Sequence, residues 1–353
     1  MPCSPVSTQR STICRRKPPK KESRMSIEPE PLDREAAEAP LPDSYVIEGE
    51  NPDIELAVRI MRERGYVILR GCLPKDAVDA VAERTEEMLR QPSVAGVWGY
   101  YRADHQKKVI QPTLLGAPVY PVIANERVLD IAETYLGSEC ILAETNLKAD
   151  RGMGYVYFPM HSDFAAGWHK SADHVSPISQ DTMKLPLGVG GAIYLHDTSE
   201  GAFSYCTGTH KLGAPHGQRL NEYPKAMQDD VMAKKVRLDG RKGDIVLFDD
   251  SGFHGPDHPS RADRTLILVD YYRTDILGNE QVTPLPIWSC DIGGLSSRQL
   301  RVLGANSSYV RPFDRYKWNK IKKSWAFGPI TFLIENAFIG SHLRMKLKSM
   351  LRK

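Results

Sequence analysis

Three side chains in the sequence could together bind a metal ion. His161 and Asp163 form the only H-x-D pattern in the chain, and residues two apart on an extended strand point to the same face of the strand. His254, which follows a predicted strand, is the candidate third ligand, with His258 close enough in sequence to be confused with it. Two histidines and one carboxylate are the ligand set of non-haem Fe(II) oxygenases. Taken alone, the H-x-D pattern also fits a surface turn in which a histidine and an aspartate share a hydrogen bond.

An arginine downstream adds to this pattern. Arg264 comes ten residues after His254 and opens a predicted strand. A guanidinium group there can hold a carboxylate through two parallel hydrogen bonds. A 2-oxoglutarate molecule that chelates iron through its keto-acid end needs such a partner for its distal carboxylate. The residues therefore favour an iron and 2-oxoglutarate site over a hydrolytic zinc site, for which the chain has no H-E-x-x-H pattern.

Short strands predominate around these residues. From Cys140 onward, β-rich runs alternate with Gly, Pro and Asp turns, which predicts an antiparallel sandwich or barrel. The predicted strands in this part cover 141–148, 154–158, 190–196, 202–206, 236–238, 244–248 and 265–272. Before them, helices are predicted over 53–64, 74–91 and 126–136, with a strand over 66–69. A helical N-terminal part packed on a β-sandwich, an α+β fold, is the simplest architecture.

Charge and composition divide the chain into three predicted regions. The net charge of +3 combines +6 in residues 1–24, +9 in residues 315–353 and hence −12 in the body between them. Residues 1–44 have few large apolar side chains and are predicted to be disordered. Residues 45–290 are the predicted catalytic domain, and residues 291–353 a basic, partly helical extension. The acidic body argues against nucleic-acid binding.

The cysteines and the basic tail bear on location. Six scattered cysteines without a C-x-x-C pair indicate free thiols in a reducing compartment, and no apolar stretch reaches the roughly 18 residues of a transmembrane helix, so a cytoplasmic location is expected. Residues 315–353 combine ten Lys and Arg with the apolar stretch 327–339. This tail could contact an anionic membrane surface peripherally. Alternatively, it could be a helix docked on the sandwich with a solvated basic end.

Several motifs, in one order, resemble the phytanoyl-CoA dioxygenase family, which includes the ectoine hydroxylases. The resemblance covers roughly residues 44–273 and is carried by RERGYVILRGCLPKDAV, HSDFAAGWH, HDTSEGAFSYCTGTHK and KGDIVLFDDSGFHGPDHPSRADRTLILVDYY. It implies a double-stranded β-helix (a jelly-roll) with flanking N-terminal helices, and Fe(II), 2-oxoglutarate and O2 as cofactor and co-substrates. It also implies that His161, Asp163 and His254 bind the iron and that Arg264 binds 2-oxoglutarate.

The resemblance suggests further contacts, each with a plainer alternative. Asn146 and Lys148 precede the H-x-D pattern where family members often place a polar contact to 2-oxoglutarate, although a solvated strand edge would also carry such residues. Phe164, Trp168 and His169 could line the substrate mouth or simply pack. The carboxylate of the H-x-D pattern favours hydroxylation, or a related desaturation or ring closure, because related halogenases replace it with a small residue.

The expected function is hydroxylation of a small molecule by a 2-oxoglutarate-dependent dioxygenase, with release of succinate and CO2. The alternative is a catalytically silent jelly-roll that binds a ligand and uses its basic tail at a membrane. The complete ligand set and Arg264 disfavour this alternative, because decay normally erodes one of these residues. One departure from the family is Pro256, which stands where many members have a Ser or Thr hydroxyl.

Overall fold

The structure is a computed structural model that describes residues 41–42, 44–90, 100–102, 106–109, 111–167, 177–279, 281–282, 285, 287 and 292–305. Nearly all of the predicted disordered extension, and all of the basic tail over 315–353, lie outside these residues, so both remain predictions. Within the described ranges, no helix has the length and apolar character needed to cross a membrane.

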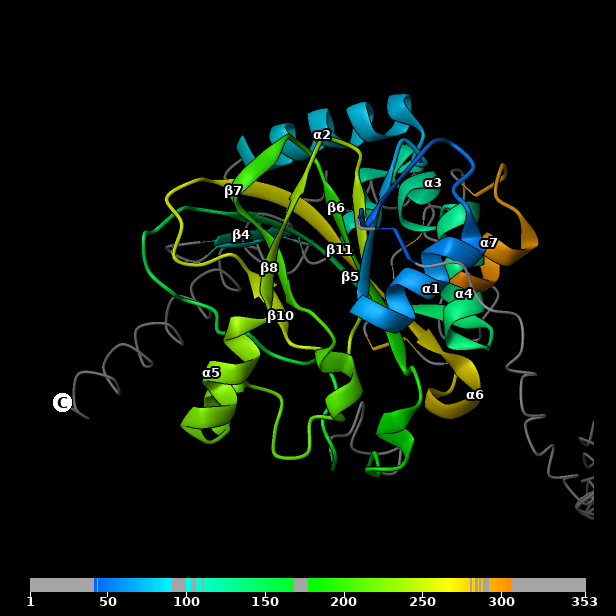
Figure 1. Cartoon of the computed structure of the whole chain (residues 1–353). Helices are drawn as coiled ribbons and strands as arrows, with labels where there is room; N and C mark the ends of the chain where they lie inside the picture. Colours follow the sequence, from blue (N-terminus) through cyan, green and yellow to red (C-terminus); the bar gives the residue numbers. More distant parts are fainter. Residues whose placement is uncertain are drawn as a thin grey trace, which may run out of the picture. The chain divides into compact units, whose positions relative to one another are not determined.

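Two β-sheets form the centre of the fold (Figure 1). The larger sheet contains β1 (Val46–Glu48), β2 (Tyr66–Arg70), β3 (Tyr100–Arg102), β4 (Gln106–Val109), β5 (Cys140–Asp150), β6 (Gly188–Tyr194), β9 (Ile245–Asp249) and β11 (Arg264–Arg273). Its strand order is β1-β2-β9-β6-β11-β5-β4-β3. The smaller sheet, in the order β10-β7-β8, contains β7 (Thr198–Cys206), β8 (Lys235–Gly240) and β10 (His254–Pro256). All described strand pairs are antiparallel except β1 with β2.

Aromatic side chains of both sheets meet between them. Tyr194 of β6, Tyr205 of β7 and Phe248 of β9 are buried in one apolar cluster, because alternate residues of each strand face the opposite sheet. The Tyr194 hydroxyl donates to the Leu238 carbonyl over 2.7 Å and accepts the Phe203 N–H over 3.0 Å. These bonds tie the larger sheet to the smaller one, so the predicted two-sheet α+β architecture is confirmed.

Helices cover the other face of the larger sheet (Figure 1). They are α1 (Ile54–Arg64), α2 (Lys75–Arg90), α3 (Tyr120–Ile123) and α4 (Glu126–Leu136). Their apolar residues share a buried cluster with Ile267, Val269 and Tyr271, which alternate with the inward-facing residues of β11. The remaining helices are α5 (Lys225–Ala233), α6 (Thr274–Leu277) and α7 (Ser297–Val302), with 3₁₀ turns at Pro112–Leu115, Ala117–Val119, Thr182–Lys184, Thr209–Leu212 and Leu220–Glu222.

One predicted strand is wrong. Residues 154–158 form no strand, and Tyr155, Val156 and Phe158 are exposed. Their aromatic and β-branched side chains favour a strand locally, but no neighbouring strand pairs with them in the described part of the chain. The other predicted strands and helices are present, with ends that differ by up to four residues.

Candidate metal centre

Two backbone hydrogen bonds join the histidines of the predicted metal site. The His161 N–H donates to the His254 carbonyl over 3.0 Å, and the His254 N–H donates to the His161 carbonyl over 2.8 Å. Residues that exchange both bonds in this way lie directly opposite each other, with side chains on one face. Their ring centroids are 4.4 Å apart. The fold thus brings together two residues that are far apart in the sequence.

Asp163 lies in an irregular segment, not on the extended strand that the H-x-D spacing suggested. Its N–H donates to the Asp250 carbonyl over 2.9 Å, and its own carbonyl accepts the side-chain amide of Gln218 over 2.8 Å. The hydroxyl of Ser162 donates to the Ser251 carbonyl over 3.0 Å. These contacts, in place of strand geometry, fix the backbone that carries the carboxylate.

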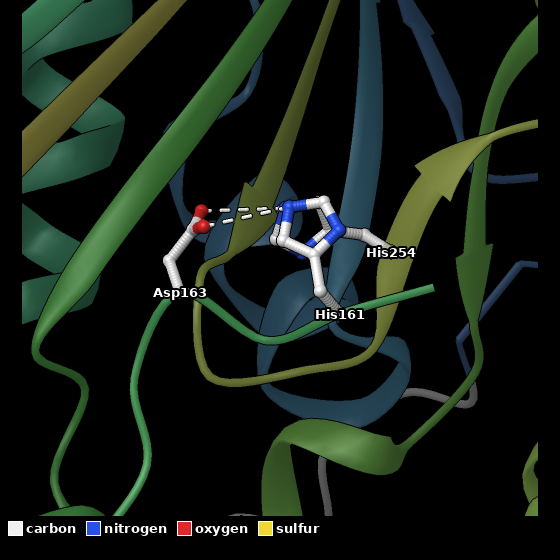
Figure 2. Close-up of side chains that lie close together, drawn as sticks. All are labelled: His161, Asp163 and His254. Atoms are coloured by element: carbon white, nitrogen blue, oxygen red, sulfur yellow. Dashed lines mark ion pairs between the residues drawn. The ribbon is translucent and has the colours of Figure 1, made fainter. Parts of the chain in front are cut away.

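The three side chains converge on one point (Figure 2). The Nε2 atom of His161 is 3.6 Å from Asp163 Oδ1, and the Nε2 atom of His254 is 3.3 Å from Asp163 Oδ2. The two Nδ1 atoms lie 3.2 Å and 3.0 Å from the carbonyls of Pro159 and Gly252. Each ring can therefore donate from Nδ1, which leaves the Nε2 lone pair free for a metal ion. Two imidazole nitrogens and one carboxylate fit Fe(II).

Burial and neighbouring charges keep two of these side chains in the protonation states that bind metal. Burial, together with the nearby His254 ring, lowers the pKa of His161 to about 4. Burial alone would raise the pKa of Asp163, but the two imidazoles and the Lys148 ammonium lower it to about 2. At neutral pH the His161 imidazole is therefore neutral and the Asp163 carboxylate is ionised.

Two further carboxylates lie against Asp163, and the sequence analysis missed both. Oxygens of Asp163, Asp250 and Asp270 all lie within 4.8 Å of one another. Burial and mutual repulsion raise the pKa of Asp250 and of Asp270 well above the usual range. The Gly190 N–H lowers the pKa of Asp250 only in part, and no side chain among the described residues donates a hydrogen bond to Asp250. One signal did point to Asp270, which is an acid inside the apolar run 266–272.

Arg264 and Lys148 lie on the inner face of the larger sheet, which is the face turned toward the smaller sheet. In the register of β11 with β5, Arg264 is opposite Asp150 and Leu266 is opposite Lys148. Arg264 is buried, and its Nε and Nη2 atoms are both 2.8 Å from one oxygen of Asp150. The amide of Gln106 donates to the other Asp150 oxygen over 2.6 Å. The predicted clamp for 2-oxoglutarate is thus already held in place by an internal carboxylate.

Lys148 and Asn146 retain unused hydrogen-bonding groups in this space. The Nζ atom of Lys148 lies 5.7 Å from the centre of the Phe158 ring and forms no ion pair within the described ranges. Its charge affects the pKa of both His161 and Asp163, which places it near the predicted metal ligands. Asn146 is buried on the same face, and its side-chain oxygen has no partner among the residues described.

The residues predicted to contact substrate are only partly described. Phe164 is fully buried in an apolar cluster, which leaves it no accessible surface in this structure. Trp168 and His169 lie outside the described residues. His258 does not join the metal-binding cluster, and its ring packs on Tyr157 at a centroid distance of 4.2 Å.

Similar proteins were found in comparisons with a family model, with individual protein sequences and with solved structures. The family model for phytanoyl-CoA dioxygenase (PhyH) matches residues 61–263. An ectoine dioxygenase of Nocardia farcinica (strain IFM 10152) is 24% identical over 212 residues, which are 54% of this chain and 68% of that protein. The crystal structure of EctD from S. alaskensis with 2-oxoglutarate and 5-hydroxyectoine is 18% identical, with a TM-score of 0.49 over 62% of this chain and 76% of that one. The non-heme alpha ketoglutarate dependent carbocyclase SnoK from nogalamycin biosynthesis is 20% identical, with a TM-score of 0.46 over 64% and 85%.

The family match spans more than half of the chain and includes the predicted metal ligands His161, Asp163 and His254, while Arg264 lies one residue beyond its end. The chain is a 2-oxoglutarate-dependent dioxygenase, an oxidoreductase that uses Fe(II), 2-oxoglutarate and O2. Within that class, it belongs to the phytanoyl-CoA dioxygenase (PhyH) family. The resemblance seen in the sequence is thereby confirmed.

Proposed function

We propose that this enzyme hydroxylates a small molecule within a double-stranded β-helix, converting 2-oxoglutarate to succinate and CO2, with His161, Asp163 and His254 as the iron ligands. The main support is the convergence of two Nε2 atoms and one carboxylate within 4.8 Å of one another. When bound, Fe(II) together with O2 and 2-oxoglutarate supplies the oxidising chemistry, and the protein supplies orientation. The Asp163 carboxylate favours hydroxylation, or a related desaturation or ring closure, over halogenation.

In this proposal, Lys148, Asn146 and Arg264 bind the co-substrate. Lys148 has an ammonium group without a carboxylate partner among the described residues, close to the metal ligands. Arg264 lies farther along the same inner face, and Asp150 fixes its guanidinium by binding Nε and Nη2. Its Nη1 atom has only a 3.5 Å contact with the Ala202 carbonyl. That nitrogen can therefore donate to a distal carboxylate at little cost.

The decisive experiment is an anaerobic titration of Fe(II) and 2-oxoglutarate, followed by the metal-to-ligand charge-transfer absorption band. The wild-type chain should bind one Fe(II) and develop the band. His254→Ala should lose both, because it removes one of three protein ligands, whereas His258→Ala should keep its iron. His216→Ala is a matched control, since His216 is exposed and lies outside the cluster.

Undiminished iron binding and an unchanged band in His254→Ala would contradict the assignment of His254 as an iron ligand. If the band forms as expected, admission of O2 with candidate substrates should yield succinate in step with a hydroxylated product. Succinate without any product across a broad screen of small molecules would contradict the proposed hydroxylation.

For the basic tail over 315–353 we propose peripheral contact with an anionic membrane, supported by its sequence alone. The segment carries a net charge of +9 and the apolar stretch 327–339. Each basic residue near an anionic surface contributes about 1 kcal/mol, and salt weakens this attraction. The full chain should therefore co-sediment with phosphatidylserine vesicles at low salt, whereas a chain ending at Asp314 should stay in solution. Failure of the full chain to bind at low salt would refute the contact.

A further inference from the structure

Charge is separated along the inner face of β5 and β11. The directly opposed residues on this face are, in order, Arg264 with Asp150, Leu266 with Lys148, Leu268 with Asn146, and Asp270 with Glu144. Successive pairs are about 7 Å apart, because alternate residues of a strand share a face. The first two pairs bring the cations of the proposed co-substrate site, and the last pair brings two carboxylates. The metal ligand Asp163 lies at the acidic end, within 4.8 Å of Asp270.

Lys148 and Lys108 act on Asp270 only at longer range, and the acidic end has no direct ion pair in the described part of the chain. None of the described Lys, Arg or His residues forms an ion pair with Asp270, Glu144 or Asp250. Asp250 is fully buried, and no side chain there donates a hydrogen bond to its carboxyl group. Asp270 and Glu144 are only partly buried, so a ligand can reach them.

Two glycines make room for this acid. A Cβ atom at Gly188 would lie 2.5 Å from an Asp250 oxygen, and one at Gly190 would lie 2.3 Å from the other oxygen. Both distances are far below van der Waals contact, so a larger residue at either of these two positions would collide with the carboxylate. The fold therefore accommodates a buried acid for which the described residues supply no side-chain or charged partner. A group without an internal partner points to a ligand that is not part of the chain.

Iron and co-substrate would leave the acidic end uncompensated. The two positive charges of Fe(II) would face the Asp163 carboxylate and the doubly negative 2-oxoglutarate. The charge of Arg264 is already matched by Asp150, and Lys148 lies between the two ends, acts on Asp270 at longer range and forms no ion pair with it in the described ranges. A cationic ligand at Asp270 and Glu144 would stabilise the ionised form of Asp270, which burial and the neighbouring carboxylates disfavour in its absence.

We propose that Asp270, assisted by Glu144, binds a protonated amine of the substrate, so that the enzyme is selective for cationic small molecules. This inference rests on the proposed function and names the substrate class of the same site. Because Asp270 adjoins the metal ligand Asp163, the amine would be held beside the metal centre. The oxidised C–H bond would then lie within a few bonds of the nitrogen.

The test compares amines with alcohols of the same shape. The probes are benzylamine, cyclohexylamine and butylamine, each paired with its alcohol, and they are titrated by calorimetry into the anaerobic Fe(II) and 2-oxoglutarate complex. Each amine should bind wild type roughly 10- to 100-fold more tightly than its alcohol, as a charge-assisted hydrogen bond predicts. Asp270→Asn should reduce that ratio to about 3 or less, and Asp270→Glu should restore part of it. Asp239→Asn removes the same charge from the exposed surface and should leave the ratio unchanged.

Each outcome decides the inference separately from the proposed function. If wild type forms no charge-transfer band, the proposed function fails before any amine is added. A normal band with no amine preferred over its alcohol overturns the inference alone, as does a preference that survives in Asp270→Asn. Loss of the band in Asp270→Asn, or a second equivalent of Fe(II) that this variant loses, would instead make Asp270 a metal ligand and overturn its substrate role.

Discussion

Removing the guanidinium of Arg264 while Asp150 remains should destabilise the folded chain as well as weaken co-substrate binding. The two side chains are only 8% and 3% exposed, and two N–H groups donate to a single carboxylate oxygen over 2.8 Å. Breaking a buried ion pair by removing one partner costs about 3–5 kcal/mol, because the other charge is left unpaired. Arg264→Met should therefore lose a large share of a total stability that is typically about 5–15 kcal/mol.

The double variant Arg264→Met/Asp150→Asn separates the two effects. It leaves no unpaired buried charge, so most of the lost stability should return. Affinity for 2-oxoglutarate should not return, because the donor to the distal carboxylate is still missing. That loss is expected to be about 2–4 kcal/mol, or roughly 30- to 1000-fold in dissociation constant.

Two measurements check this reasoning. Urea unfolding of the four metal-free proteins gives the coupling between Arg264 and Asp150 as a double-mutant cycle. Titration of the anaerobic Fe(II) forms with 2-oxoglutarate gives the co-substrate affinity. Wild-type stability in Arg264→Met would refute the energetic role of the pair. Wild-type affinity in the double variant would show that Arg264 is not the clamp, and Lys148 would be the next residue to test.

Three further predictions concern the metal-free protein. Because the pKa of His161 is about 4 when folded and near 6.5 when unfolded, the unfolded chain takes up a proton first as pH falls. The free energy of unfolding should therefore drop by on the order of 3 kcal/mol between pH 7 and pH 4, and a pH series of urea melts on His161→Asn should show a smaller drop. The raised pKa of Asp250 has the opposite sign, since its stabilisation is present in acid and is lost as pH rises. Asp250→Asn should then melt higher than wild type at pH 8 but not at pH 4, and a difference independent of pH would contradict this. At Gly190, an added Cβ would lie 2.2 Å from the Phe248 ring. Gly190→Ala should therefore lower the free energy of unfolding in urea by about 1–3 kcal/mol or more. The control Gly293→Ala meets nothing within 4 Å and should change it by no more than about 0.5 kcal/mol.

The cluster of candidate metal ligands could be predicted because the spacing and chemistry of these residues are local signals. The H-x-D pattern and a histidine next to a strand needed no knowledge of the fold, and His161, Asp163 and His254 do converge. The expected reason, that His161 and Asp163 share one face of an extended strand, was nonetheless wrong. Asp163 does not depend on strand geometry, and contacts with Asp250 and Gln218 hold it instead.

The partners of the site residues could not be predicted in the same way. Asp150 meets Arg264 through the register of β5 with β11, and a single sequence does not give the register of strands that are distant along the chain. Asp250 and Asp270 look like ordinary acids until the fold places them beside Asp163. The failed strand over 154–158 has a related cause, because a strand needs a partner as well as suitable side chains.

Because His161 and His254 exchange two backbone hydrogen bonds, metal binding at the site should change the exchange rates of their backbone amide protons. Each amide proton is protected from exchange with solvent only while the other histidine stays in place. A metal ion that holds both imidazoles would slow local opening of this bridge, by a factor that grows with its concentration relative to its dissociation constant. Hydrogen–deuterium exchange at these two amides would therefore rank metals and co-substrate analogues by how strongly they stabilise the bridge against local opening, without any turnover.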